Sequence, residues 1–144
     1  MSYELGKVLG KGGMGLVYLA KEKNSGQEVA YKVLLRKENC TEPALQAARR
    51  LRDEAQAARV NHENLIKLIA AGESKEHGPF IVYEYIKGGT LRQGLSQKGP
   101  LQADAFMEKL AIPILSALAT LHQAGVIHRD IKCENVFVCE DGKY

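Results

Sequence analysis

The chain has 144 residues, of which 45% are hydrophobic and 26% are charged, and its formal net charge is +3. This composition fits one folded domain of ordinary size, and the charge is too small to indicate a nucleic-acid partner by itself. The one tight basic cluster, Arg49, Arg50 and Arg52, is followed at once by Asp53 and Glu54. It therefore predicts a solvated helix face rather than a nucleic-acid-binding patch.

Cysteine usage and hydropathy bear on the compartment. Cys40, Cys133 and Cys139 are odd in number and form no C-x-x-C pair, so neither a disulfide framework nor a zinc site is indicated. No basic start precedes a long apolar run, and the longest apolar stretches, at 80–83 and 111–121, are too short to span a bilayer. We expect a cytoplasmic location and no membrane segment within these residues, although an anchor could lie beyond them.

The first third of the chain predicts an antiparallel β-meander. Short apolar runs lie at 5–9, 16–19 and 29–34. Glycines separate the first two runs, and "KNSGQ" separates the second from the third. This segment predicts a turn, because Asn and Gly both tolerate a positive φ. A helix is expected next, with Thr41 as N-cap and Pro43 in its first turn, ending at the "NHEN" segment.

Two more strands are predicted at 65–73 and 79–86, joined by the polar turn "SKEHG". The pattern is helical from Leu91 onward, and its longest element covers 103–125, with Gly125 as its C′ glycine. Pro113 should bend this helix or remove one of its hydrogen bonds. Its apolar residues cover much of the circumference, which is typical of a helix buried inside a larger structure. The change from β to α near 87–91 predicts a boundary between two lobes.

Gly10, Gly12 and Gly15 stand at G-x-G-x-x-G spacing. Alone, this spacing fits a dinucleotide-binding turn, a phosphate-covering hairpin or a plain glycine-rich turn. In a dinucleotide site the glycines open a helix and an acidic residue follows about 20 positions later. Here the next segment, "LVYLA", has strand character and "VAYK" occupies the later position, so the hairpin is favoured. Its glycines would let backbone N–H groups approach phosphate oxygens.

Lys32 lies in the middle of the apolar strand "EVAYKVL". It could be an edge-strand lysine that reaches water, or a cation for phosphate, and the residue alone does not decide between them. If buried, it needs a carboxylate partner. Glu54 is a candidate because it flanks the buried face of its expected helix, although by itself it would be an ordinary surface residue.

The segment "HRDIKCEN" is the most specific signal in the chain. It places Asp130, Lys132 and Asn135 within six residues after the long helix. A carboxylate can accept or orient a hydroxyl proton, a lysine can neutralise a transferred phosphoryl group, and an asparagine oxygen suits Mg²⁺. Standing alone, the run could also be a polar loop with chance charges.

A glycine hairpin, a strand lysine, a helix glutamate and an HRD-x-K-x-x-N loop occur here in that order. The order resembles the eukaryotic-type protein kinase family, and "GKGGMGLVY" is similar to its bacterial Ser/Thr kinases. The implied fold is α+β and protein-kinase-like: an N-terminal antiparallel β-sheet lobe with one helix, followed by the start of a mainly helical C-terminal lobe. Residues 1–86 would form the N-lobe and hinge, and residues 87–144 the start of the C-lobe.

The resemblance implies ATP and Mg²⁺ as cofactors. Backbone groups of Glu84 and Ile86, beyond the gatekeeper Tyr83, would hydrogen-bond to the adenine, while Val17 and Ala30 would pack on it. The flap over the phosphates would comprise Leu9, Gly10, Lys11, Gly12, Gly13, Met14 and Gly15.

The resemblance also assigns the reacting groups. Lys32, oriented by a salt bridge to Glu54, would hold the α- and β-phosphates. Asp130 would be the catalytic base towards a Ser or Thr hydroxyl of a protein substrate, Lys132 would contact the γ-phosphate, and Asn135 would ligate one Mg²⁺. The loop would be supported by His128 and Arg129.

One departure concerns the family's Asp-Phe-Gly segment, whose Asp binds Mg²⁺. Only "VFVCEDGKY" follows Asn135 here, so we expect an incomplete kinase domain that is inactive and poorly soluble as a piece. The alternative is a non-catalytic nucleotide-binding or interaction module, a truncated pseudokinase. A Rossmann dehydrogenase is disfavoured by the hairpin context.

Overall fold

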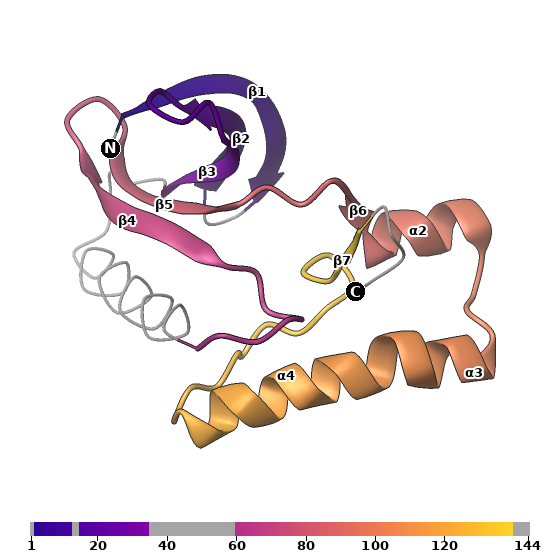
Figure 1. The fold of residues 1–144 in the computed structure, drawn as a ribbon. Coiled ribbons are helices and arrows are strands. Elements are labelled where there is room, and N and C mark those ends of the chain that lie inside the picture. Colours follow the sequence, from indigo (N-terminus) through magenta and orange to yellow (C-terminus); the bar gives the residue numbers. More distant parts are fainter. Residues whose placement is uncertain (1, 13–14, 35–59, 140–144) are drawn as a thin grey trace, which may run out of the picture. The chain divides into compact units, whose positions relative to one another are not determined.

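The computed structural model of the chain describes residues 2–12, 15–34 and 60–139. These residues form two compact units (Figure 1). The first unit comprises Met1–Ala58 and Ile66–Tyr85, and the second comprises Arg59–Leu65 and Ile86–Tyr144. The helix expected after Thr41, and with it Glu54, lies outside the described residues, as do Gly13 and Met14.

The first unit contains a five-stranded sheet in which all neighbours are antiparallel. The strand order is β1-β2-β3-β5-β4. The predicted meander is confirmed as β1, β2 and β3, and both later strands are present. The bounds are β1 (Tyr3–Gly12), β2 (Gly15–Glu22), β3 (Glu28–Leu34), β4 (Leu68–Ser74) and β5 (Gly78–Glu84).

Two predicted strands are longer than the observed ones. The strand predicted from 65 begins only at Leu68, because Leu65 closes a turn in which its N–H donates to the His62 carbonyl (3.0 Å). The strand predicted to 86 ends at Glu84. Apolar residues continue beyond both ends, so hydrophobic pattern alone could not place them.

Strand alternation gives the sheet one strongly buried face. The central cluster there is Ala20, Val29, Tyr31 and Val82, each at most 4% exposed. Tyr31 stacks on Phe80 with ring centroids 4.8 Å apart, and burial raises the pKa of the Tyr31 hydroxyl. Because side chains alternate along a strand, Ala30 and Lys32 point to the opposite face.

The second unit combines a small two-stranded sheet with helices. Strands β6 (Gly88–Thr90) and β7 (Phe137–Cys139) pair antiparallel, and helix α2 (Leu91–Lys98) follows β6 directly. A longer helix comprises α3 (Ala103–Phe106), the π-helical turn η1 (Met107–Ala111) and α4 (Ile112–Gln123). The helical prediction from Leu91 onward is therefore confirmed.

The π-helical turn η1 lies just before Pro113 and allows the helix to continue past this proline. Proline has no N–H to donate, and its ring clashes with the carbonyl four residues earlier in a regular α-helix. Just before it, the Ile112 N–H donates to Met107, five residues back, so the helix widens instead of breaking. The predicted disturbance at Pro113 is confirmed in this form, and Gly125 adopts a φ of 73° beyond the helix end.

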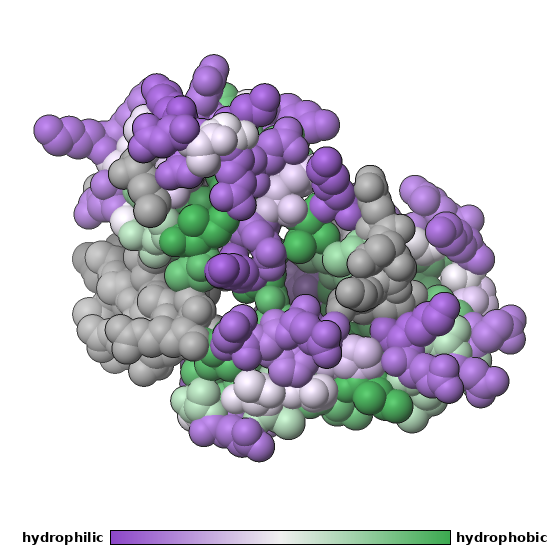
Figure 2. Space-filling view, viewed as in Figure 1, coloured by the Kyte–Doolittle hydropathy of each residue, from purple (hydrophilic) through white to green (hydrophobic). Residues whose placement is uncertain are grey.

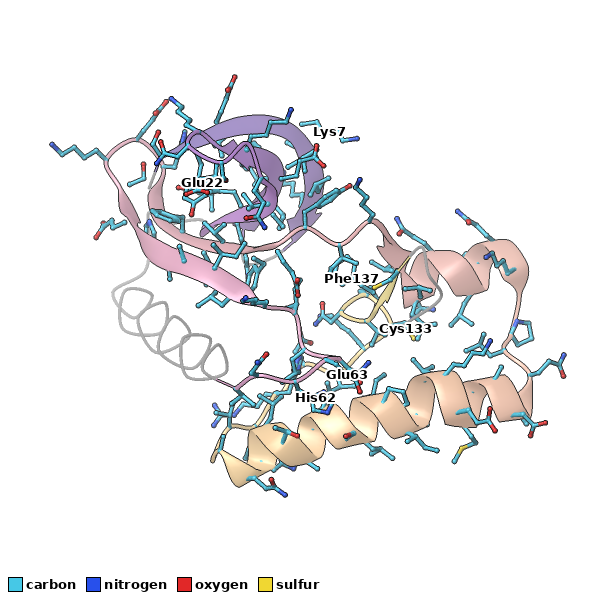
Figure 3. All side chains as sticks on the ribbon, viewed as in Figure 1. Lys7, Glu22, His62, Glu63, Cys133 and Phe137 are labelled. Carbon is cyan, nitrogen blue, oxygen red and sulfur yellow. The ribbon has the colours of Figure 1, made fainter. Side chains whose placement is uncertain are left out.

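Residues 59–65 belong to the second unit because His62 contacts α4 (Figure 3). Its Nδ1 accepts the Asn64 N–H at 3.1 Å, while its Nε2 lies 3.0 Å from the Ser116 hydroxyl. In the tautomer whose Nδ1 accepts this N–H, the proton is on Nε2, which then donates to the Ser116 hydroxyl.

The long helix buries only part of its apolar surface among the described residues. Leu110, Ala117 and Leu121 are buried. Large hydrophobic side chains between 47% and 62% exposed include Phe106, Met107, Ile112 and Leu115, and hydrophobic residues lie open along this helix in Figure 2.

By length and composition, Ala103–Gln123 could cross a membrane. The helix is longer than the apolar stretch at 111–121 because it continues through η1 into α3. Core helices of soluble proteins meet the same criterion, so it carries little weight alone.

Candidate active site

Asp130 lies at the centre of a compact polar cluster in the loop after α4. Lys132 Nζ lies 2.9 Å from both carboxylate oxygens of Asp130. Asn135 Nδ2 donates to the Asp130 carboxylate oxygen Oδ2 and to its backbone carbonyl, each at 2.8 Å. The three residues singled out by spacing are thus brought together, and the carboxylate is held from two sides.

The backbone on both sides of Asp130 has a defined turn conformation. Arg129 has a φ of 61°, the one positive value recorded for a non-glycine residue in the described part of the chain. A left-handed residue of this kind reverses the chain direction at some cost in strain. The Asp130 N–H then donates to His128 Nδ1 at 3.3 Å, and the Asn135 N–H closes a turn onto the Lys132 carbonyl at 2.9 Å.

The charges around Asp130 keep it ionised. The hydrogen bond from Lys132 holds the pKa of the Asp130 carboxyl below its ordinary value, and the hydrogen bond from Asn135 acts in the same direction. The carboxylate is 42% exposed, so solvent screens part of this effect. At neutral pH it is a charged, oriented hydrogen-bond acceptor, as needed to align a hydroxyl group.

The same cluster leaves an oxygen available for a cation. Because the Asn135 amide uses its nitrogen towards Asp130, its Oδ1 keeps its acceptor capacity. Amide and carboxylate oxygens are ligands that Mg²⁺ accepts, usually together with several waters. Within residues 2–12, 15–34 and 60–139, no group of three or more His, Cys, Asp or Glu side chains could hold a metal ion. The Asn135 amide oxygen is of the type that could serve as one such ligand.

A second set of predicted residues lies on the opposite face of the first unit's sheet from the buried cluster. Gly10 pairs with Val17, Val17 with Lys32, and Lys32 with Ile81, forming one row across four strands. Ala30 follows on the same face two residues from Lys32. The glycine strand, Val17, Ala30 and Lys32 are thus neighbours in register, as expected for groups that share a ligand.

The glycine segment is a hairpin. Gly12 pairs with Gly15, and β2 follows as a strand, so the helix that a dinucleotide-binding turn requires is absent from this described segment. A Cβ built on Gly10 would meet no atom within 4 Å, so packing does not account for a glycine there. The open space above Gly10, in the row with Val17 and Lys32, fits a closely approaching ligand such as a phosphate chain.

Neighbouring positions of the hairpin are irregular. The register shifts between Val8 and Gly10, which leaves Leu9 as the extra residue of a bulge. A bulge redirects a side chain, and Leu9 is 39% exposed. Lys11 pairs with Leu16 and is exposed near the end of the strand.

At the end of β5, Glu84 is tied to the preceding segment. Its backbone N–H donates to the Lys67 carbonyl (3.0 Å), and its Oε1 accepts the Lys67 N–H (2.7 Å). A donor on a ligand would therefore have to meet the Glu84 carbonyl rather than its N–H. Tyr83, the predicted gatekeeper, pairs with Ala30, and Ile86 is half-buried.

Sequence reasoning missed one ion pair of the loop. Arg92 Nε donates to Glu134 Oε1 at 3.0 Å, next to Asn135. These residues are 42 positions apart, and although Glu134 lies within "HRDIKCEN", nothing in the sequence near Arg92 indicates that the two side chains meet.

Comparison with known proteins shows the family to which this chain belongs. The family model for the protein kinase domain matches residues 3–144. The chain belongs to the protein kinase family. The predicted α+β kinase fold is thereby confirmed, with the five-stranded sheet of the N-terminal lobe and the first helices of the C-terminal lobe.

Several bacterial kinases are similar to this chain. A probable serine/threonine-protein kinase of Streptomyces coelicolor is 42% identical over 145 residues, covering 98% of this chain and 21% of that protein. Serine/threonine-protein kinase PknB of Mycobacterium tuberculosis is 39% identical, covering 94% of this chain and 22% of that protein. Serine/threonine-protein kinase pkn3 of Myxococcus xanthus is 36% identical, covering 94% and 24%. The chain thus spans about a fifth to a quarter of the length of these relatives.

Proposed function

We propose that the protein carrying this chain transfers the γ-phosphoryl group of ATP to Ser or Thr hydroxyls of proteins. The observation that carries the proposal is the Asp130 carboxylate held between Lys132 and Asn135. Membership of the kinase family and the printed names of its relatives support the reaction class. The protein substrate would supply the hydroxyl group.

In the proposed reaction, Asp130 accepts the hydrogen bond of the substrate hydroxyl and directs its oxygen towards the phosphorus. Its lowered pKa makes it a weak base, so it mainly orients the hydroxyl until the proton becomes acidic in the transition state. Lys132 neutralises charge on the transferred group. Asn135 offers its amide oxygen to Mg²⁺, which supplies charge neutralisation on the phosphates when bound.

The nucleotide would be held by the row found in the first unit. Lys32 would bind the α- and β-phosphates, with Glu54 as its proposed partner, and Val17 and Ala30 would contact the adenine. The open space at Gly10 supports a phosphate flap that runs from Leu9 to Gly15. The carbonyl of Glu84 and the backbone of Ile86 would bind the adenine edge.

The proposal treats residues 1–86 as N-lobe and hinge and residues 87–144 as the start of the C-lobe. The division of the structure after Tyr85 supports a boundary next to this one, although Ile86 and residues 59–65 group with the second unit. A cytoplasmic location belongs to the same proposal, since ATP is present there and a reducing environment suits the thiol of Cys133.

The test is phosphoryl transfer from labelled ATP to a generic basic protein by the full-length gene product. Asp130→Asn keeps the shape and the Asn135 contact but removes the carboxylate, and we expect kcat to fall about 100-fold or more with little change in ATP affinity. Equal background rates for both proteins would instead favour the non-catalytic nucleotide-binding or interaction module.

A further inference from the structure

The first turn of α2 binds the backbone of the catalytic loop directly. The Leu91 N–H donates to the Val136 carbonyl at 2.7 Å, and the Arg92 N–H donates to the Cys133 carbonyl at 3.1 Å. The N–H groups of a helix's first turn have no partner within the helix, so these bonds satisfy donors that would otherwise require water. The loop segment around 133–136 is therefore attached to a helix end, not only to itself.

A side-chain ion pair strengthens the same attachment. Arg92 Nε and Glu134 Oε1 are 3.0 Å apart, with side chains 59% and 48% exposed. Figure 3 shows Cys133 and Phe137 next to the start of α2, which agrees with the pairing of Phe137 and Thr90.

Asn135 connects this attachment to the reacting carboxylate. It lies between Glu134 and Val136, the two residues that α2 holds through a side chain and through the backbone. Its Nδ2 in turn donates to Asp130 Oδ2 at 2.8 Å. Glu134 is thus one residue away from the donor that contacts the Asp130 carboxylate.

We propose that Arg92 is a positioning residue for Asp130, holding Asn135 against the Asp130 carboxylate through its ion pair with Glu134. The inference rests on the proposed kinase function and extends it to a residue on α2 outside the reacting groups. Arg92 acts through Glu134 and Asn135. Its replacement should disturb the chemical step without changing how ATP is bound.

The kinetic test compares Arg92→Gln, Glu134→Gln and the double variant in the full-length protein. Lys98→Gln, which removes an exposed cation from the opposite end of α2, is the matched control. Each single variant should lower kcat about threefold to tenfold with KM for ATP unchanged, because the backbone bonds remain and limit the misplacement. The double variant should be no slower than the worse single variant, because both changes remove the same pair. Multiplying losses, or an Arg92→Gln protein that behaves like Lys98→Gln, would overturn the proposal.

A second measurement, independent of catalysis, follows the carboxyl titration of Asp130 by NMR. Glu134→Gln is the decisive variant, because the two possible effects have opposite signs. Loss of a nearby negative charge would by itself lower the pKa of Asp130, whereas loss of the Asn135 hydrogen bond raises it. We expect a raised midpoint in Glu134→Gln and no change in Lys98→Gln. A lowered or unchanged midpoint contradicts the positioning role.

The two readouts keep the two proposals apart. A wild-type protein without phosphoryl transfer would refute the proposed function, while the titration of Asp130 would still test the attachment. Arg92→Lys, which keeps the charge, should recover part of the kcat lost in Arg92→Gln. If Arg92→Gln fails to fold, Glu134→Gln alone carries the comparison, because it removes the same ion pair.

Discussion

At the scale of single residues, the loop after α4 brings together three polar residues that are spaced closely in the sequence. The spacing of Asp130, Lys132 and Asn135 predicted that they act together, and the structure brings all three into hydrogen-bond contact. The motif did not reveal which groups would face each other. That depends on the positive φ of Arg129 and on the turn that Asn135 closes onto Lys132, which are backbone features of this loop.

Lys132→Gln should raise the pKa of Asp130, because Lys132 is the largest cause of its lowering. In the wild type the native pKa lies below the unfolded one, so this carboxylate stabilises the fold above the unfolded pKa. That stabilisation is lost as the pH falls through the native value. In the variant the two values lie closer together, and the gain in stability between acid and neutral pH shrinks.

NMR titration of the Asp130 carboxyl, together with the free energy of unfolding measured from acid to neutral pH, checks this expectation. Lys109→Gln, an exposed lysine of η1, is the control for loss of one positive charge. A midpoint that stays put or falls in Lys132→Gln would show that the contact with Asp130 does not persist in solution.

Gly10→Ala should separate nucleotide binding from folding. A Cβ at this position meets open space, so the unliganded protein should keep its stability to within about 0.5 kcal/mol. If phosphates approach this backbone, ATP affinity should weaken about tenfold, or roughly 1.4 kcal/mol. Isothermal titration with ATP and thermal unfolding give both numbers.

Gly94→Ala provides the matched control for that experiment. Gly94 lies in α2, where an added Cβ also meets nothing within 4 Å and alanine favours the helix. It should raise stability slightly and leave ATP affinity unchanged. Equal ATP affinity in Gly10→Ala and wild type would argue against a phosphate flap at Gly10.

At the scale of elements, α2 is defined by its N-terminal cap. The Thr90 hydroxyl accepts the Gln93 N–H at 3.2 Å, and Gln93 Oε1 accepts the Thr90 N–H at 2.8 Å, which completes a capping box. The change to helix at Leu91 was predicted from the sequence, but this cap was not identified there. Thr90 also ends β6, so one residue terminates a strand and starts a helix.

Thr90→Ala should destabilise the second unit by about 1 kcal/mol, the usual cost of losing a side-chain N-cap. Thr90→Ser keeps the hydroxyl and should retain most of that stability. Chemical denaturation followed by circular dichroism compares the three proteins. Equal midpoints for the Ala and Ser variants would mean that the cap contributes nothing measurable.

At the scale of the whole molecule, the long helix presents apolar surface that the described residues do not cover. Phe106, Met107, Ile112 and Leu115 are each about half exposed or more. Exposed apolar groups gathered in this way promote self-association. We therefore expect the isolated 144-residue chain to bind hydrophobic dyes and to associate in a concentration-dependent manner.

The combined change Ile112→Gln and Leu115→Gln should reduce dye binding and shift the sedimentation profile towards monomer. Ala119→Gln, an exposed position on the same helix without a large apolar side chain, is the control. A wild-type chain that is already monomeric, with no dye binding and a sharp unfolding transition, would contradict the expectation.

Apart from β6, the sequence alone predicted the strands and helices that the structure describes, the hairpin at the glycines, the disturbance at Pro113 and the grouping of Asp130, Lys132 and Asn135. These features depend on the alternation of polar and apolar residues, on turn-forming residues and on short spacings, all of which involve residues close together in the sequence. Tertiary structure decided which distant groups meet: the row of Gly10, Val17 and Lys32 through strand register, and the pair of Arg92 and Glu134 through the docking of α2. No local pattern specifies such contacts, because register and docking depend on how the whole fold buries its apolar surface.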